Sequence, residues 1–262
     1  MKFDGIESEA YSEFFENIEK YYKYSYNKIS QAMLQKRNIF FWQYSEKEFI
    51  SLLLLNKVLF QNIKGYFDLI NQNLPLPAFS CLRSAVETFR LFRLYYIDET
   101  FRKDYVENKN FNFNQAYDRK FQQGNIIKKL DELETQLKKE DKISIGSPIL
   151  SNHLFTKGSD MSSLHSELSK WSHGLNINLY LQAMIIDKEK IFTGIEDVYS
   201  EIMQKYIKKY TEGCYFIIAE QNSLLLNLLV CYDTKILDEL DRMFNVYLKY
   251  VKIAYKNKEV SV

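Results

Sequence analysis

Apolar residues recur along most of the chain at intervals of three and four positions, a spacing that is typical of amphipathic helices. The first such run predicts a helix over about Ser8–Gln35. Residues 45–48 read Ser-Glu-Lys-Glu, which has the form of a capping box and predicts that a second helix begins there and continues to about Asn71. Apolar side chains occupy most of the circumference of this second helix, so we expect it to be central. The apolar face of the first helix consists of Phe14, Phe15, Ile18, Tyr21, Tyr22, Ile29 and Met33.

Breaks in the helical spacing separate the next elements. The segment Asn71–Pro77 ends the second helix, and Pro77 suits the first turn of a third helix that runs to about Glu107. After a polar segment at residues 109–114, a fourth helix or pair of helices reaches about Lys139. The expected core stripe of the third helix is Phe79, Leu82, Val86, Phe89 and Tyr96, and the expected seam of the fourth is Ile126, Leu130, Leu133 and Leu137.

The third quarter of the chain is less regular. Residues 141–160 show no period and contain two glycines and a proline, so we expect a long loop, which in a compact domain is often functional. A short helix follows over about Met161–His173, and Gly174 is suited to end it. Residues 177–186 fit either a strand or a helix, and residues 187–194 read as a turn.

Two long helices, over about 195–232 and 235–256, complete the predicted elements. Glycine occurs only 8 times and proline 3 times, which argues against an all-β fold with many tight turns. Aromatic residues make up 16% of the chain, enough to fill a sizeable core. We therefore expect an all-α fold: one helical domain of six to eight helices over residues 1–262.

Charge and cysteine content limit the partners and the cellular location that we expect. The net charge of +1 excludes a strong whole-chain field for nucleic acid or anionic membrane, so only a local patch could serve. The N-terminus is acidic and lacks the apolar region of a signal peptide. Of the two most apolar stretches, residues 50–60 are too short to span a bilayer and residues 214–232 carry Glu220 near their middle. The odd set of cysteines, Cys81, Cys214 and Cys231, has no close pair, and we expect a cytoplasmic protein with no membrane partner.

The first candidate site lies on the predicted third helix. Arg83, Glu87 and Arg90 share one face, and four of the chain's seven arginines fall between residues 83 and 102. A guanidinium is always charged and presents a planar fork that fits carboxylate or phosphate. The alternative is an ordinary Arg83–Glu87 pair within one helix, worth a few tenths of a kcal/mol.

The second candidate site is the short helix, because all three histidines lie between residues 153 and 173. Histidine is the side chain whose ordinary pKa lies near neutral pH, so His173 is a candidate general acid or base. His165, Ser169 and Lys170 lie near His173 on this helix and are candidate binding residues. The alternative for His173 is a capping or core histidine. The histidine spacings match no metal motif, and no nucleotide-binding, metalloprotease or hydrolase motif occurs, so we expect no metal and no cofactor.

Two short motifs carry a resemblance. Leu82–Thr88 reads L-R-S-A-V-E-T, and Leu168–Gly174 reads L-S-K-W-S-H-G. The pair resembles a group of bacterial all-helical proteins related to the HEPN superfamily, in which an R-S-x-x-E helix packs near an L-S-x-x-x-H helix. The resemblance covers about residues 45–232, with 233–262 as a C-terminal helix. It implies a single up-and-down helical bundle, HEPN-like and often dimeric, with polar residues at a cleft between helices.

The best-known HEPN proteins are metal-independent ribonucleases of toxin–antitoxin, phage-defence and RNA-guided systems, with Arg and His four to six residues apart on one helix. Here no arginine lies within six residues upstream of a histidine, so Arg83 would act from another helix, with Glu87 orienting His173. Three functions remain open. The first is an RNA-associated or protein-interaction module of a bacterial defence, toxin–antitoxin or stress system, acting as a homodimer or with a protein partner, with at most degenerate ribonuclease chemistry. The second is an active metal-independent ribonuclease, and the third is a small-ligand binder.

Overall fold

The computed structural model describes residues 44–107, 121–139, 160–172, 185–187, 190–191 and 201–229, together with isolated helical positions between residues 16 and 34. Within these ranges the chain is almost entirely helical, which confirms the all-α prediction. The six helices described are α2 (Glu46–Asn71), α3 (Pro75–Ile97), α4 (Glu99–Glu107), α5 (Gln123–Lys139), α6 (Asp160–Ser172) and α8 (Glu201–Leu229), and the strands are β1 (Ile185–Asp187) and β2 (Lys190–Ile191).

The chain divides into two compact units, one formed by residues 38–221 and the other by residues 1–37 and 222–262. The core and the candidate site described below belong to the first unit. The prediction of one domain over the whole chain stays a prediction. The predicted segments 109–114 and 235–256, and all of the predicted loop 141–160 except Asp160, lie outside the described residues.

The start of α2 and the turn into α3 follow the sequence closely. Ser45 Oγ accepts a hydrogen bond from the Glu48 backbone N–H (3.3 Å), and the Ser45 N–H donates to Glu48 Oε2 (2.6 Å), so the predicted capping box is confirmed. The helix ends at Asn71, as expected. Asn73 then takes a left-handed conformation (φ 60°), which asparagine tolerates better than most residues, and Pro75 opens α3.

The prediction of one continuous third helix is wrong, because the chain bends at Asp98 and continues as α4. Asp98 is extended (φ −110°, ψ 104°), and its Oδ1 accepts a hydrogen bond from the Phe101 N–H (3.0 Å), which caps the new helix. Carbonyl oxygens at the end of α3 are satisfied by a side chain, since Arg102 Nη1 donates to the Tyr95 and Tyr96 carbonyls (3.2 and 3.3 Å). The Asp-Glu-Thr sequence at residues 98–100 is the signal for this break.

A buried ion pair joins α4 to the start of α2. Arg102 Nε donates to Glu48 Oε1 (3.0 Å), and the two side chains are only 8% and 7% exposed. The guanidinium also lies over the Tyr44 ring, 4.2 Å from its centroid, while Tyr95 donates its hydroxyl hydrogen to the Glu48 carbonyl (2.7 Å). Burial raises the pKa of Glu48, but hydrogen bonds with Ser45 and Arg102 outweigh it, so the pKa is held below its ordinary value.

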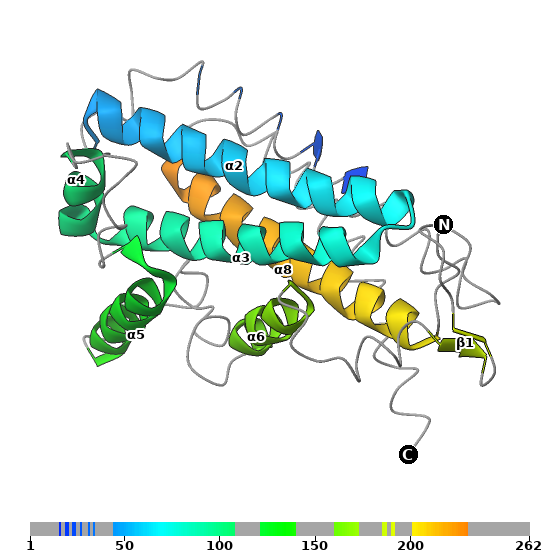
Figure 1. Ribbon diagram of the computed structural model, residues 1–262. Helices are drawn as coiled ribbons and strands as arrows, with labels where there is room; N and C mark the ends of the chain where they lie inside the picture. Colours follow the sequence, from blue (N-terminus) through cyan, green and yellow to red (C-terminus); the bar gives the residue numbers. More distant parts are fainter. Residues whose placement is uncertain are drawn as a thin grey trace, which may run out of the picture. The chain divides into compact units, whose positions relative to one another are not determined.

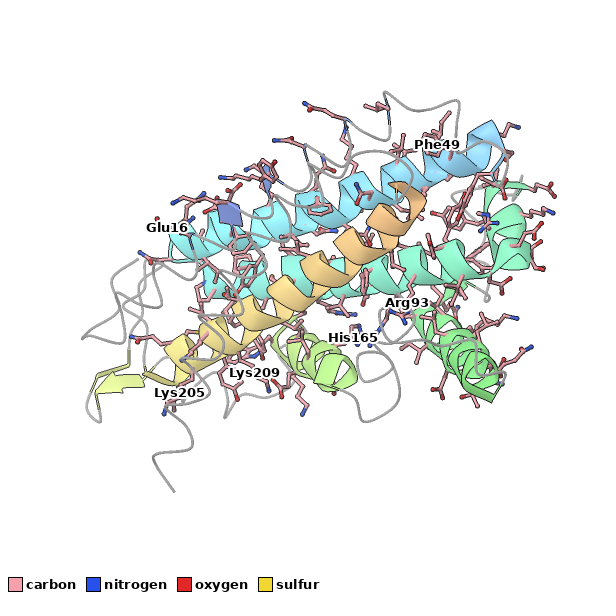
Figure 2. The ribbon with its side chains drawn as sticks, turned by 180° about the vertical axis from the view of Figure 1, so that it is seen from behind. Glu16, Phe49, Arg93, His165, Lys205 and Lys209 are labelled. Carbon is pink, nitrogen blue, oxygen red and sulfur yellow. The ribbon has the colours of Figure 1, made fainter. Side chains whose placement is uncertain are left out.

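The core of this unit lies where α2, α3 and the part of α8 up to residue 221 meet (Figures 1 and 2). Helices α2 and α3 run side by side as an antiparallel pair, and α8 crosses them diagonally. Two buried polar contacts fix the crossing: Tyr66 OH lies 2.8 Å from Thr211 Oγ1, and Gln221 Nε2 donates to Asn56 Oδ1 (2.9 Å). The expectation that α2 is central holds on one side only, because some of its apolar residues are exposed: Ile50, Leu54 and Val58.

The expected core stripe of α3 is confirmed at four of its five positions. Phe79, Leu82, Val86 and Phe89 are fully buried, whereas Tyr96 is half-buried and its neighbour Tyr95 is in the core. The α5 seam is confirmed at Ile126 and Leu130, which are buried, while Leu133 is only half-buried. The side chain of Leu137 lies outside the described set.

Residues 177–186, for which strand and helix were both open, and the predicted turn at 187–194 contain a short pair of antiparallel strands. Strand β1 pairs with β2, with Ile185 opposite Ile191 and Asp187 opposite Lys190. The strand alternative is therefore correct for residues 185 and 186, and the predicted turn contains the last residue of β1 and all of β2. In the part of the chain that the structure describes, no helix combines the length and the apolar character needed to cross a membrane.

Candidate functional site

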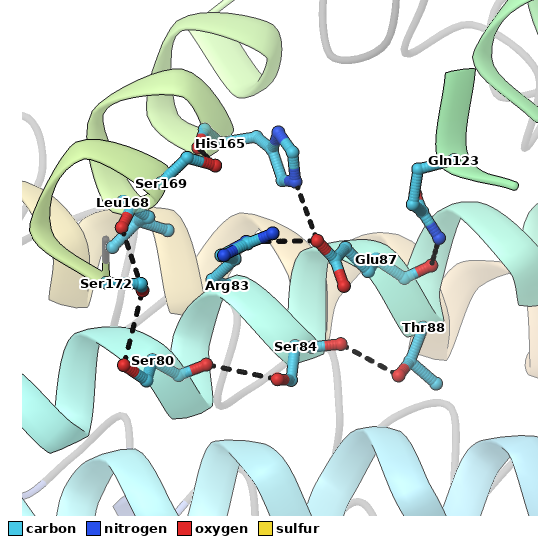
Figure 3. Close-up of polar contacts among 10 residues, drawn as sticks. All are labelled: Ser80, Arg83, Ser84, Glu87, Thr88, Gln123, His165, Leu168, Ser169 and Ser172. Carbon is cyan, nitrogen blue, oxygen red and sulfur yellow. Dashed lines mark hydrogen bonds and ion pairs between the residues drawn. The ribbon is translucent and has the colours of Figure 1, made fainter. Parts of the chain in front are cut away.

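A three-residue cluster lies between α3 and α6, and we call it the Arg–Glu–His cluster. Arg83 and Glu87 are one turn apart on α3, and Arg83 Nε donates to Glu87 Oε1 (3.1 Å). His165 reaches across from α6 and places its Nε2 at 3.0 Å from the same carboxylate oxygen (Figure 3). Glu87 and His165 are 78 positions apart in the sequence, and their two helices bring a guanidinium and an imidazole to one carboxylate.

The cluster is partly open to solvent, since the side chains of Arg83, Glu87 and His165 are 26%, 28% and 20% exposed. The hydrogen bond with His165 lowers the pKa of Glu87; burial opposes it, and the charge of Arg83 lowers the pKa further, so the net shift is downward. An ionised carboxylate only accepts hydrogen bonds, so His165 Nε2 carries the hydrogen and donates. Its Nδ1 makes no hydrogen bond to any described residue, and in the neutral ring this nitrogen is a proton acceptor.

Hydroxyl groups extend the polar seam beyond the cluster (Figure 3). Ser80 Oγ on α3 and Ser172 Oγ on α6 lie 3.2 Å apart, a second polar link between the two helices. On α3, Ser84 and Thr88 donate to carbonyls one turn earlier. On α6, Ser169 does the same to the His165 carbonyl (2.8 Å). Because Ser172 also donates to the Leu168 carbonyl (3.0 Å), the hydroxyl hydrogens of all five residues are used within the two helices, and their oxygens are left as acceptors.

Apolar packing on the neighbouring face of α6 holds His165 in this position. Leu164, Leu168 and Trp171 are buried, and Trp171 Nε1 donates to Tyr210 OH on α8 (2.9 Å). The absence of a side chain at Gly213 lets α8 approach α6 closely, because a Cβ there would lie 2.7 Å from Leu164 Cδ2. His165 comes next to Leu164 in the sequence and so lies at the edge of this buried stripe, where its side chain reaches Glu87 on α3.

Arg90 lies one turn beyond Glu87 and is buried in full, with 1% of its surface exposed. Its Nε and Nη1 atoms are enclosed and have no hydrogen-bond partner. Burial lowers the pKa of Arg90 to about 10, although the negative charge of Glu87 acts in the opposite direction. Gln123 at the start of α5 donates through Nε2 to the Glu87 carbonyl (3.2 Å), while its Oε1 is buried without a partner.

The structure joins some of the predicted site residues and separates others. Arg83 and Glu87 form the expected pair, which is more than an internal helix pair because His165 completes it. Ser169 bonds within its own helix, and Lys170 is exposed. His173, the predicted acid or base, lies outside the described residues, so its role stays a prediction.

Two features of the site were not anticipated from the sequence. The first is the contact between His165 and Glu87, because the sequence offered His173 as the group that Glu87 orients and His165 only as a binding residue. The position of His165 beside the buried Leu164 and Leu168 is the signal that indicates it. The second is Gln123, which a single sequence gives no reason to connect with α3. Among the described side chains, no three His, Cys, Asp or Glu residues gather closely enough to hold a metal ion.

A separate cavity of about 410 Å³ lies between α4 and α5 and does not include the cluster. Most of its lining residues are polar or charged, and Phe101 is the one aromatic residue among them. The lining residues are Leu94, Asp98, Thr100, Phe101, Asp104, Asn125, Lys128, Lys129 and Glu132.

Comparison of the chain with protein-family models, with curated proteins and with solved structures finds no match in any of the three. The HEPN resemblance therefore rests on the two sequence motifs and stays a prediction.

Proposed function

We propose that this chain is an RNA-associated helical protein in which the Arg–Glu–His cluster binds an RNA phosphate and supports slow, metal-independent cleavage. The observation that carries the proposal is the convergence of Arg83 and His165 on Glu87 from two different helices. A fixed positive charge beside a positioned imidazole is the combination that phosphodiester chemistry uses without a metal. The HEPN-like motifs support the choice of RNA and a place in a bacterial defence, toxin–antitoxin or stress system.

Each residue of the cluster has a distinct task in the proposed reaction. Glu87 holds the imidazole through Nε2 and so fixes the tautomer in which Nδ1 accepts a proton. His165 Nδ1 takes the proton of a ribose 2′-hydroxyl, and the 2′-oxygen forms a bond to the adjacent phosphorus. The bond from phosphorus to the 5′-oxygen breaks, and that oxygen takes a proton from water. The hydroxide that remains takes the proton held on His165 Nδ1, which restores the neutral imidazole. Arg83 stabilises the negative charge that develops on the phosphoryl oxygens.

The cluster is also incomplete by the standard of an efficient nuclease. It contains one imidazole, so no second described side chain is placed to protonate the leaving oxygen. General acid–base catalysis by one positioned group contributes about 10²–10⁴-fold, which sets the scale of the expected rate enhancement. Binding without efficient turnover is therefore the expected behaviour, in agreement with a module that has at most degenerate ribonuclease chemistry.

The test uses the full chain with single-stranded RNA in the presence of a chelator. Wild type is expected to bind the RNA and to release products with 2′,3′-cyclic phosphate and 5′-hydroxyl ends. His165→Asn is expected to keep binding and to lose cleavage by about 10²-fold or more, whereas Arg83→Met is expected to weaken both. Lys57→Met is the matched control, because it removes an equal charge from an exposed position on α2.

Three outcomes decide the proposal. RNA binding that is lost in Arg83→Met but kept in Lys57→Met supports it, and cleavage that also disappears in His165→Asn supports the chemical step. Binding without cleavage in wild type reduces the function to RNA association. Wild-type protein that neither binds nor cleaves RNA overturns the proposal and leaves the protein-interaction role.

A further inference from the structure

Four exposed lysine side chains gather on the outer side of the α6–α8 pair, and we call them the α6–α8 lysine surface. They are Lys170 on α6 and Lys205, Lys208 and Lys209 on α8. Among the side chains described on α6 and on residues 202–210 of α8, Glu167 is the one carboxylate. Four lysines against one glutamate leave an excess of three positive charges, whereas the whole chain carries a net charge of only +1. The excess is therefore a local patch of the kind that a nearly neutral chain needs in order to attract a polyanion.

Contacts between α6 and α8 bring Lys170 close to the lysines of α8. Residues later in α6 meet residues earlier in α8, so the two helices run antiparallel here. The contacting pairs are Leu164 with Gly213, Glu167 with Lys209, and Trp171 with Tyr206, whose ring centroids lie 5.3 Å apart. Lys170 directly precedes Trp171, and Lys205 directly precedes Tyr206, so both lysines belong to the same end of the α6–α8 interface.

Three of the four lysines are not engaged by the described part of the fold. Lys209 pairs with Glu167 at 2.7 Å, whereas Lys170, Lys205 and Lys208 form no ion pair with any residue that the structure describes. Lys205 and Lys209 also lie four positions apart on α8, and like charges at this spacing destabilise a helix. The arrangement opposes folding slightly and attracts a ligand of the opposite charge.

Helix α6 separates this surface from the Arg–Glu–His cluster. Figure 2 labels His165 and Lys209 on either side of α6, in agreement with the bonds from His165 to α3 and from Glu167 to α8. At about 3.6 residues per turn, the described side chains on the outer face of α6 between α3 and α8 are all polar. In order around the helix they are His165, Ser169, Ser166, Lys170 and Glu167. A helix with its side chains is about 10–12 Å wide, so a short stretch of a polyanion reaches across it.

Lysine suits the backbone of a nucleic acid, because its ammonium group contacts phosphates as a point charge without requiring one orientation. We propose that the α6–α8 lysine surface binds the phosphates of single-stranded RNA and so holds the strand across α6, with a neighbouring phosphate at the Arg–Glu–His cluster. This inference deepens the proposed function and rests on it for the choice of RNA as the polyanion.

The test measures the affinity of the full chain for single-stranded RNA as a function of salt concentration. The variant combines Lys170→Gln, Lys205→Gln and Lys208→Gln, three exposed side chains without a described ion pair, so its Tm is expected to equal that of wild type. One phosphate contact contributes about 0.7 to the slope of log affinity against log salt for a single strand, so the variant is expected to lose about 2 from the slope and about tenfold or more in affinity at low salt.

A matched control and a second substrate separate this effect from a general loss of charge. The control variant combines Lys57→Gln, Lys103→Gln and Lys128→Gln, which removes three exposed lysines from α2, α4 and α5 and is expected to keep the wild-type slope. Wild type is also expected to bind a long RNA more tightly than a dinucleotide, which is too short to cross α6. The variant of the α6–α8 lysine surface is expected to lose most of that gain.

Equal salt slopes in wild type and in the variant of the lysine surface overturn the inference. It is also overturned if polyglutamate of equal charge competes as well as RNA does, because the surface then fits an acidic protein. A slope that falls with the three lysines while Arg83→Met binds RNA normally supports this inference and removes the cluster from the proposed function. RNA binding that depends on Arg83 and not on the three lysines supports the proposed function alone.

Discussion

Replacing Arg102 with methionine is expected to destabilise the protein more than any other single loss of charge in the described helices. The substitution removes the bond to Glu48, the two bonds to the carbonyls that end α3, and the contact with the Tyr44 ring. It leaves the Glu48 carboxylate buried without a counter-ion, and breaking a buried pair in this way costs about 3–5 kcal/mol. For a chain of this size we expect Tm to fall by about 10 °C.

Urea unfolding followed by circular dichroism measures the cost. The matched control is Lys103→Met, one residue along α4, because Lys103 pairs with Glu99 (2.6 Å) in full contact with solvent. An exposed pair of this kind contributes little because water screens both charges, so the loss in Lys103→Met is expected to be several times smaller than the loss in Arg102→Met. Equal losses in Arg102→Met and Lys103→Met would refute the idea that burial of the pair decides its contribution.

A double-mutant cycle isolates the pair itself. Glu48→Gln keeps the side-chain type that a capping box accepts while removing the negative charge. Once the charge of Glu48 is gone, loss of Arg102 no longer leaves a buried ion, so the double variant is expected to be more stable than the sum of the single losses by about 1–3 kcal/mol. Strict additivity would show that the two side chains act independently.

Three further outcomes follow from contacts described above. Gly213→Ala forces a methyl group against Leu164 and is expected to lower the free energy of unfolding by about 1–2 kcal/mol despite the helix propensity of alanine, which thermal unfolding measures. Gly124→Ala, with no atom within 4 Å of the new Cβ, is expected to be neutral or to stabilise by up to about 1 kcal/mol; the reverse order of the two variants would contradict this account. Because His165 holds the folded pKa of Glu87 down, the stability that Glu87 contributes is present above its unfolded pKa of about 4.3 and is lost as pH falls through the folded value. The free energies of unfolding of wild type and Glu87→Gln, measured in urea, are therefore expected to differ at pH 7 and to converge below about pH 4. A difference between the two free energies that stays constant with pH would count against the His165–Glu87 hydrogen bond.

The structure could be predicted from the sequence where interactions within a few residues decide it. Ser45 and Glu48 form a capping box because both partners lie within one helical turn, so no distant residue can alter the outcome. The stripe from Phe79 to Phe89 is buried because its 3.6-residue period places it on one face. The break at Asp98 was missed because the apolar period continues past it, and only the Asp98 cap and the distant Glu48–Arg102 pair make two helices preferable to one.

The candidate site also combines a local contact, which the sequence predicts, with a non-local one, which it does not. Arg83 and Glu87 were predictable as a pair, since four positions along a helix bring two side chains together. Which histidine joins them was not predictable, because that depends on the position of α6 along α3. Contacts of α6 with α8 set this position: Trp171 bonds to Tyr210, and Gly213 lies against Leu164. Non-local packing of this kind leaves no periodic signal in a single sequence.

The burial of Trp171 gives the protein an internal optical reporter. Trp171 is one of two tryptophans in the chain, its indole is 2% exposed, and its ring centroid lies 5.3 Å from that of Tyr206 on α8. Its fluorescence therefore responds to the docking of the helix that carries His165, with emission moving to longer wavelength when water reaches the indole. In a Trp42→Phe background this single emitter would follow the opening and closing of the α6 interface in real time, without any added dye.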